Sequence, residues 1–399
     1  MPERDIKQEA QKLQPQIVAW RREFHQCPEL KMDTVITAGK IETILKEIGV
    51  EDIRTGVGGN GIACTIHGDA PGKCLGIRAD CDGLPIREET GLPFASTNGN
   101  MHACGHDAHT AMALGAVKLL WGYRSHLPGK VKFIFQPYEE GDGGAKAMLA
   151  DNVLEDPHVD NMIALHTGNL MGSQFTAGDI GYHPEVSSFA IRPFRVKFMG
   201  KGTHACAPHK GADPVLTACY AVVQLQALLS RERDPVRPVI VSVSVIHGGV
   251  RNNVVPDDCY IEGTIRSTSR EEQDYYFKRV GEICRDVAAS MRGSVEVEQI
   301  FDLMPTVNAP EMVAKFLKIA PKVVGPERVK RIEHLEPVGE DFARFADIVP
   351  SLYFFHCSAF GDERDHPHHN PKFDIDESVL WSGTALFAQF ALDWQKEEN

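Results

Sequence analysis

Short apolar runs that end in acidic or histidine residues recur through the first half of the chain. These runs and the polar residues after them are Cys74–Arg78 before Asp80 and Asp82, Val131–Phe135 before Glu139 and Glu140, and Asn161–Leu165 before His166. Helical patterns lie between them, at 109–120 and 143–149. This alternation predicts an α/β fold with a central, mostly parallel sheet flanked by helices. Because open α/β sheets bind ligands at the carboxyl ends of their strands, the polar residues predict a functional site there.

Hydrophobic spacing also predicts the domain organisation. A chain of 399 residues is too long for one ordinary hydrophobic core, so we expect two domains. After about Ser187 the pattern becomes that of an α+β unit with two helices and about four strands, in the segments 189–198, 211–229, 239–246, 259–265 and 270–291. The run 352–355 then returns to the earlier pattern of a strand followed by polar residues. We therefore predict an inserted domain at 187–303 and a main domain formed by 1–186 and 304–399.

Charge and composition narrow the possible partners and the compartment. The formal net charge is −13, which argues against a nucleic-acid partner. The sequence has no run of eighteen apolar residues, and its polar N-terminus lacks the apolar core of a signal peptide, so we expect no membrane association. The ten cysteines are scattered. Free thiols and a cytoplasmic location are therefore expected.

The segment Met101–His109, with the sequence MHACGHDAH, carries the strongest chemical signal. Cys104 and His106 are two residues apart, and a loop turning at Gly105 can direct both side chains to one metal ion. Further residues of ligand type are Glu140, His166 and His369. Mixed sulfur, nitrogen and oxygen ligands suit zinc, cobalt or manganese better than magnesium or calcium. We therefore expect two divalent cations per subunit that activate water, as in a hydrolase.

The neighbouring glutamates require separate roles. Adjacent residues of an extended segment point in opposite directions, so Glu139 and Glu140 are not expected to bind the same ion. One of them can be a ligand while the other acts as the general base that takes a proton from water and delivers it to the leaving nitrogen. Asp82 and Asp107 are suited to holding a histidine ring in one tautomer. His366 and His368, close to His369, are expected in an exposed loop.

Other functions are compatible with some of these residues. Cys104 could be the nucleophile of a thiol hydrolase, with a histidine as its base. The cluster could also be a metal site without catalysis, although the spare glutamate argues against this. An iron oxygenase with two histidines and a carboxylate fits poorly, because the thiolate and the additional ligands are not needed for it.

Ordered motifs along nearly the whole chain resemble those of the aminoacylase, hippurate hydrolase and auxin-conjugate amidohydrolase group of dinuclear metallopeptidases, which are relatives of glutamate-releasing carboxypeptidases. The motifs are Arg21–Leu30, Arg78–Ile86, Met101–His109, Gln136–Gly141, Leu165–His166, Gly339–Phe342 and His369–Phe373. Asp80 stands where the related carboxypeptidases have a histidine, and Cys104 where they have a bridging aspartate. The chain thus resembles the cysteine-bearing branch of the group.

The resemblance implies an activity, and a role for each of these residues. The activity is hydrolysis of N-acyl amino acids or related amide conjugates, with Glu139 as the general acid/base. The implied metal ligands are Cys104, His106, Glu140, His166 and His369. The inserted domain is implied to be a lid that makes the protein a homodimer or a higher homo-oligomer. In that lid, His204 is implied to stabilise the oxyanion, while Asn253 and Arg266 hold the substrate carboxylate.

Overall fold

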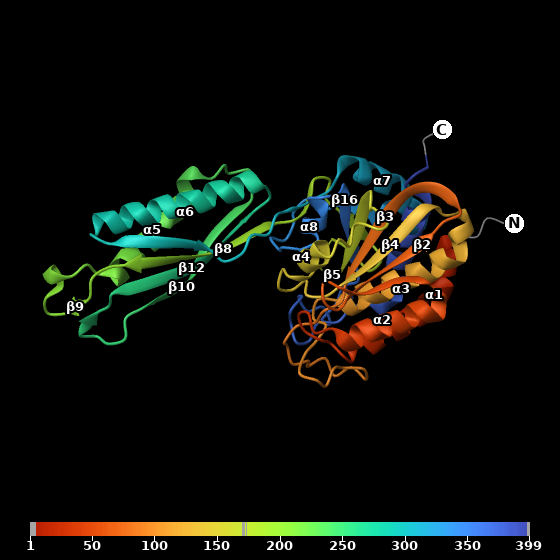
Figure 1. Cartoon of the computed structure of the whole chain (residues 1–399), viewed down its shortest axis with the longest axis horizontal. Helices are drawn as coiled ribbons and strands as arrows, with labels where there is room; N and C mark the ends of the chain where they lie inside the picture. The colour runs from red at the N-terminus through yellow and green to blue at the C-terminus, as the bar shows by residue number, and fades with distance from the viewer. Residues whose placement is uncertain (1–4, 170–171, 173, 397–399) are drawn as a thin grey trace. The chain divides into compact units, whose positions relative to one another are not determined.

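The computed structural model describes residues 5–169, 172 and 174–396, and the chain divides into two compact units (Figure 1). Unit 1 takes the chain up to Ser187, then Thr306–Glu336, and then the chain from Asp341 onward. Unit 2 is Ser188–Pro305 together with the short segment Pro337–Glu340. The second unit is therefore inserted in the first, and the chain passes between the units four times rather than twice.

Unit 1 is built on an eight-stranded sheet in the order β1-β2-β4-β3-β5-β16-β6-β15. Its strands are β1 (Asp52–Val57), β2 (Gly61–His67), β3 (Ala70–Asp80), β4 (Pro128–Gln136), β5 (Asn161–Gly168), β6 (Ile180–Tyr182), β15 (Val329–Arg331) and β16 (Ser351–Cys357). The four central strands β4, β3, β5 and β16 are parallel to one another. Strands β1 and β2 are added in antiparallel pairs at one edge. This confirms the α/β class with a mostly parallel central sheet.

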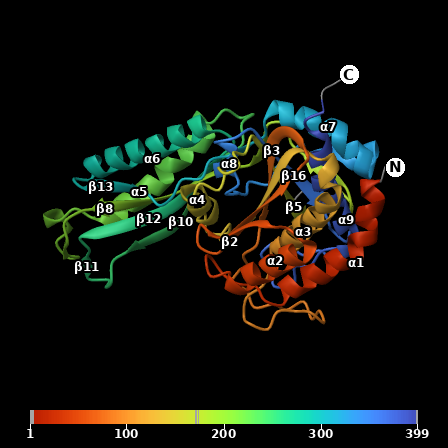
Figure 2. The same cartoon turned by 45° about the vertical axis from the view of Figure 1, so that its right-hand side comes forward.

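Both faces of the central strands are buried: successive side chains of a strand point to opposite faces, and those of β5 and β16 are buried throughout. In β16, Leu352 and Phe354 join one apolar cluster, whereas Tyr353 and Phe355 join another. The first cluster contains residues of α1 (Ile6–His25), α2 (Val35–Ile48), α3 (His106–Tyr123), α7 (Pro310–Val324) and α9 (Leu380–Asp393). The second contains residues of α4 (Gly144–Ala150) and α8 (Ala343–Ala346) (Figure 2). Helices therefore cover both faces, as expected from the near-continuous apolar strands.

Helix α2 begins without a cap from its own segment. The residue before the helix is Thr34, and its side chain makes no capping hydrogen bond. The carboxylate of Glu29 instead accepts hydrogen bonds from the backbone N–H groups of Ile36 and Thr37, at 3.1 and 2.7 Å. A carboxylate that comes from outside the helix thus satisfies its free N–H groups, which local spacing does not reveal.

Unit 2 is an α+β unit whose antiparallel sheet has the order β10-β12-β8-β13. The strands are β8 (Ala190–Met199), β10 (Val239–Gly248), β12 (Asp258–Ser267) and β13 (Ser294–Gln299). One face packs against α5 (Pro214–Ala227) and α6 (Arg270–Ser290) through residues such as Phe194, Leu225 and Ile261. A separate two-stranded ribbon of unit 2 pairs β9 (Thr203–His204) with β11 (Val254–Val255). Another ribbon pairs β7 (Val186–Ser188) with β14 (Thr306–Val307); β14 and all of β7 except Ser188 belong to unit 1.

None of the helices in the described part of the chain combines the length and apolar character needed to cross a membrane.

Candidate metal centre

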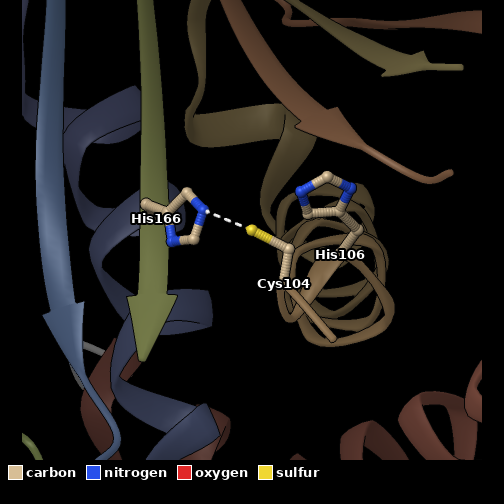
Figure 3. Close-up of side chains that lie close together, drawn as sticks. All are labelled: Cys104, His106 and His166. Atoms are coloured by element: carbon tan, nitrogen blue, oxygen red, sulfur yellow. Dashed lines mark hydrogen bonds between the residues drawn. The ribbon is translucent and has the colours of Figure 1, made fainter. Parts of the chain in front are cut away.

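The carboxyl ends of β3, β4 and β5 bring the ligand-type side chains of unit 1 together. Strand β5 carries His166, and the turn before α3 carries Cys104 and then His106, the first residue of that helix (Figure 3). Gly105 between them has φ +86°, and an added Cβ would lie 2.9 Å from Thr167 Cγ2. Only glycine adopts this conformation without strain and without a collision, so the turn depends on it.

Overlapping groups of donor atoms lie at this sheet edge. In each group, one ligand atom from every residue lies within 4.8 Å of the others. The three groups that contain proposed ligands from more than one segment and no aspartate are Cys104, His106 and His166; Cys104, Glu140 and His369; and His106, Glu139 and Glu140. Cys104 Sγ lies 3.4 Å from His166 Nε2, and His369 Nε2 lies 3.2 Å from Glu140 Oε1. Residues from four separate segments thus converge, with Cys104 shared between two of the groups.

Hydrogen bonds fix which ring nitrogen of two histidines faces the cluster. His106 Nδ1 lies 3.0 Å from the carbonyl oxygen of Asp82, and His166 Nδ1 lies 2.8 Å from that of Thr167. A carbonyl oxygen only accepts, so each Nδ1 carries the proton and donates it. The Nε2 atoms face the cluster, and in the neutral ring they hold the free lone pair that a metal ion requires.

Two buried atoms of the cluster fit a cation. His106 Nε2 has no hydrogen-bond partner among the described residues, and it lies 4.0 Å from Glu140 Oε1, the oxygen that also faces His369. Burial opposes a charge on His106, yet the carboxylates of Asp80, Asp82 and Glu140 raise its pKa to about 10. The surrounding negative charge therefore attracts a positive charge to Nε2, and a divalent cation can replace the proton there. This thiol, imidazole and carboxylate set fits divalent transition metals.

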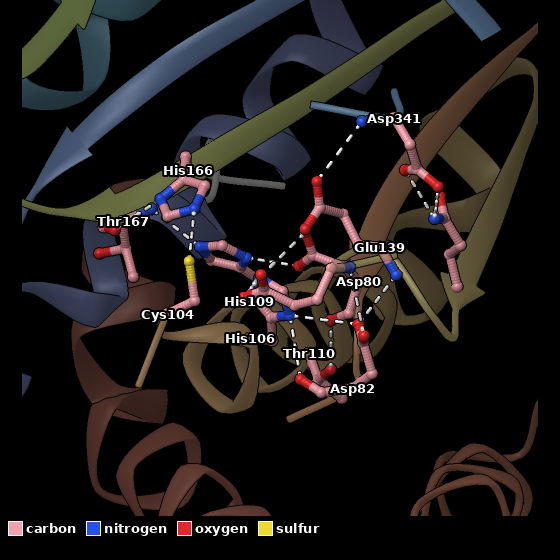
Figure 4. Close-up of polar contacts among 12 residues, drawn as sticks. Asp80, Asp82, Cys104, His106, His109, Thr110, Glu139, His166, Thr167 and Asp341 are labelled. Atoms are coloured by element: carbon pink, nitrogen blue, oxygen red, sulfur yellow. Dashed lines mark hydrogen bonds and ion pairs between the residues drawn. The ribbon is translucent and has the colours of Figure 1, made fainter. Parts of the chain in front are cut away.

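Glu139 and Glu140 lie in a turn rather than in an extended segment, so the expectation that they diverge is wrong. One oxygen of each lies within 4.8 Å of the other and of His106. Their backbone N–H groups donate to the two carboxylate oxygens of Asp82, at 3.1 and 3.3 Å. The backbone N–H of Asp341 donates to Glu139 Oε1 at 3.4 Å (Figure 4). Asp82 thus supports both glutamates as well as His106.

Asp107 directs its carboxylate at residues of α1. Its carboxylate lies 2.7 Å from His25 Nδ1 and accepts a hydrogen bond from Arg21 Nε at 2.9 Å. It therefore holds a histidine, but His25 is not one of the proposed ligands. This buried ion pair links α1 to α3, the helix that begins with His106.

His109 was not singled out from the sequence, and the environment of His366 and His368 was misjudged. His109, three residues after His106 on α3, hydrogen bonds through Nδ1 to Asp80, and its Nε2 accepts from Thr167 N at 2.8 Å. Helical spacing from His106 is the signal that indicates it. His366 and His368 are partly buried rather than exposed, and His368 Nδ1 lies 3.6 Å from Cys104 Sγ. His368 also packs against the ring of Phe373, with 4.6 Å between ring centroids.

The three remaining candidates belong to unit 2 and occupy two places in it. His204 on β9 pairs with Val254, and the carbonyl of the neighbouring Asn253 accepts a hydrogen bond from Ala205 N at 3.0 Å. Arg266 lies near the other end of the unit, on β12, where its guanidinium donates to the carbonyl of Pro337. The structure therefore brings His204 and Asn253 together and places Arg266 apart from them.

A sheet edge that gathers sulfur, nitrogen and oxygen donors beside an additional carboxylate defines a metal-dependent hydrolase. The model of peptidase family M20/M25/M40 matches residues 76–393, and the chain belongs to this family. Relatives of this chain include deacetylases and carboxypeptidases, which hydrolyse amide bonds. This chain is accordingly a metallo-amidohydrolase.

Individual relatives match over nearly their whole length. An N-acetyl-L-cysteine deacetylase of Bacillus subtilis is 35% identical over 92% of this chain and 85% of its own. Thermostable carboxypeptidase 1 of Saccharolobus solfataricus is 33% identical over 98% of both chains. The solved structure of a dinuclear metal-binding peptidase of the M20 family from Bacillus subtilis is 29% identical and superposes with a TM-score of 0.82, over 96% of this chain and 98% of its own.

Proposed function

We propose that this enzyme hydrolyses the amide bond of N-acyl amino acids or of related amide conjugates. The proposed ligands of two divalent cations are Cys104, His106, Glu140, His166 and His369. The convergence of these five side chains at one sheet edge carries the proposal. The names of relatives support the substrate class, since they include an N-acetyl-L-cysteine deacetylase and an N-acetyldiaminopimelate deacetylase from a Geobacillus species, 31% identical.

Glu139 is the proposed general acid/base. The bound cations would lower the pKa of water and polarise the amide carbonyl. The Glu139 carboxylate takes the proton from water and later delivers it to the departing nitrogen. Its position suits this role, because the backbone N–H of Asp341 orients Oε1 while Asp82 holds the turn.

His204 is the proposed donor to the oxyanion that forms on the amide oxygen. Its Nδ1 accepts a hydrogen bond from Cys206 N at 3.1 Å, so in the neutral ring the proton is on Nε2. The exposed Nε2–H is then free to donate to a developing negative charge.

Arg266 and Asn253 are the proposed contacts of the substrate carboxylate. Burial lowers the pKa of Arg266, and no carboxylate within the described residues pairs with its guanidinium. A half-buried guanidinium without a counter-ion is suited to a carboxylate ligand, to which it can donate two parallel hydrogen bonds.

The spacing within unit 2 supports a homodimer. Arg266 pairs with Ile191, whereas Met199, close to the β9 ribbon, pairs with Asp258, eight residues earlier on β12. Eight residues of strand span about 26 Å, so one copy of the unit does not place His204 and Arg266 on the same amide. We propose that a second subunit supplies His204 and Asn253.

The edge strand β10 is the proposed dimer contact. Within the described residues it pairs on one side only, with β12. Its residues Val245 and Ile246 are 36% and 50% exposed, and Tyr220 and Val223 of the neighbouring α5 are 52% and 69% exposed. An unpaired strand edge next to exposed apolar side chains suits pairing with its own copy. Unit 2 as lid and dimerisation domain, and the cytoplasm as location, are part of this proposal.

A thiol hydrolase remains the alternative, because Cys104 Sγ lies close to a ring nitrogen of His166. The electrostatics disfavour it. Burial and the carboxylates of Glu140, Glu139 and Asp80 raise the pKa of the Cys104 thiol well above its ordinary value. Burial and the nearby His109 and His368 hold the pKa of His166 well below its ordinary value, so His166 is a poor base.

One experiment tests the function and separates it from this alternative. The protein is stripped with a chelator, reconstituted separately with zinc, cobalt and manganese, and assayed on a panel of N-acyl amino acids with acetyl, benzoyl, succinyl, indole-acetyl and aminobenzoyl groups. Amide hydrolysis that disappears on stripping and returns with a cation supports the proposal. Hydrolysis that persists in the stripped protein would favour the cysteine nucleophile.

A further inference from the structure

The guanidinium of Arg78 lies beneath the candidate metal centre and is fully buried, with a side-chain exposure of 0%. It donates to three different side chains of unit 1. The contacts are Nε to Gln136 Oε1 at 2.9 Å, Nη1 to Asp80 Oδ2 at 2.8 Å and Nη2 to Asp341 Oδ1 at 2.8 Å. Because the three nitrogens of the planar fork each donate to a different side chain, Arg78 fixes the relative positions of all three.

One side of this network leads to Glu139. The Asp341 carboxylate that Arg78 holds also accepts from Gln136 Nε2, at 2.7 and 2.8 Å, and from the backbone N–H of Ala145 at 3.1 Å. The backbone N–H of the same Asp341 donates to Glu139 Oε1 (Figure 4). The residue that orients the proposed base is therefore anchored by the buried guanidinium.

The other side leads to the histidines. Asp80 bonds to His109 Nδ1, and His109 Nε2 accepts from the backbone N–H of Thr167, the residue after His166. Asp80 Oδ2 also lies 3.6 Å from His106 Nε2. Arg78 thus holds the carboxylate that lies between two segments carrying proposed ligands.

We propose that Arg78 is a positioning residue that couples the general base to the ligand-bearing histidines through the two carboxylates Asp341 and Asp80. The inference rests on the proposed role of Glu139. A lysine at this position keeps the charge but has one nitrogen, which does not reproduce three donors pointing in fixed directions. The geometry of the fork, and not only its charge, therefore sets the distance between base and ligands.

The test is a double-mutant cycle on the full-length enzyme at saturating cation. Arg78→Lys and Glu139→Gln are made singly and together, and kcat, KM, cation content and thermal midpoint are measured. Arg78→Lys is expected to lower kcat about 10- to 100-fold, with a much smaller change in KM, because a small misplacement of a catalytic group has this effect. In the Glu139→Gln background the same change is expected to lower kcat less than about threefold, because the group it positions no longer takes protons.

A purely structural role predicts a different result. If the two losses in kcat multiply in the double variant, or if Arg78→Lys leaves kcat within about twofold of the wild type, the inference is wrong. If Glu139→Gln alone retains wild-type turnover, the proposed function fails first. The two failures are thus distinguishable.

Matched variants keep the test decisive. Arg192→Lys changes another buried arginine, in unit 2, that bonds to Asp302 and Gln273, and it is expected to lower the thermal midpoint without a selective loss of kcat. Should Arg78→Lys not fold, Gln136→Met removes the acceptor of Arg78 Nε and the donor to Asp341 while retaining the volume. Gln136→Met is expected to lower kcat about three- to tenfold, less than Arg78→Lys does, and this loss must likewise vanish in the Glu139→Gln background.

Discussion

Replacing Glu139 with glutamine tests the proposed chemistry most directly. Glutamine retains the size of the side chain and an oxygen that can accept the hydrogen bond from Asp341 N, so the turn held by Asp82 is preserved. Even if the long, part-buried hydrogen bond from Asp341 N were lost, the free energy of unfolding would change by less than about 1 kcal/mol. The amide cannot take a proton from water, and general acid–base catalysis contributes about 10²- to 10⁴-fold. At about 1.4 kcal/mol per tenfold, the activation free energy should rise by about 3–5.5 kcal/mol.

The assay is release of the free amine from an N-acetyl amino acid, with cation content measured on the same sample. The five proposed ligands are unchanged in this variant, so at saturating cation we expect wild-type metal content together with the loss of kcat. Glu140→Gln is the matched comparison, because it alters a proposed ligand and should lower cation content as well. A Glu139→Gln enzyme that holds its metals and turns over within about tenfold of the wild type would refute the assignment of the base.

Three further changes have distinct expected outcomes. Arg266→Met should raise KM for N-acyl amino acids about 10- to 150-fold, the effect of one charge-assisted hydrogen bond, with little change for the corresponding amino acid amides. Burial opposes the charge of His25, but the carboxylates of Asp107 and Glu88 outweigh burial and raise the pKa of His25 above 6.5. The charge of His25 therefore stabilises the fold fully below about pH 6.5, and this contribution is lost as the pH rises through the raised pKa. In urea unfolding at a series of pH values, His25→Gln should remove this dependence of the unfolding free energy on pH. Gly144→Ala should lower the unfolding free energy by about 1–3 kcal/mol, because its Cβ would overlap the carbonyl oxygen of Pro137, whereas Gly122→Ala, with nothing within 4 Å, should be neutral or stabilising.

Periodicity predicted the parts of the fold that are determined by burial. The apolar runs before Asp80 and His166 are central parallel strands, because a strand covered on both faces must be apolar throughout. The antiparallel strands β1 and β13 are mostly exposed and were not identified, since β1 has no regular alternation and β13 has only two apolar residues, Val295 and Val297. Helix α9 was also not identified, although twelve of its fourteen residues are buried, all except Trp381 and Gln389. A helix buried on most sides has no polar stripe to reveal its period.

Contacts between distant segments limited the prediction of the site. The strand ends indicated where ligand-type residues gather, but not which carboxylate faces which histidine. Asp107 is adjacent to His106 in the sequence and yet bonds to His25, because successive residues of a helix point in different directions. The turn at Glu139 and Glu140 was likewise hidden, since the hydrogen bonds that close it come from Asp82 and from glycine N–H groups that bond to Tyr138 O.

Arg78, Asp80 and Gln136 form a polar layer beneath the candidate metal centre, and strand geometry explains this layer once the sheet is known. Arg78 and Asp80 are two residues apart on β3, so their side chains point to the same face and can form an ion pair at the strand end. The parallel neighbour β4 ends at Gln136, in register with Asp80, which places the amide beside the guanidinium. The loop after β4 then carries Glu139 directly above this layer. The order of residues on two adjacent strands therefore dictates that a fixed positive charge underlies the carboxylates of the site, which would otherwise repel one another in a buried environment.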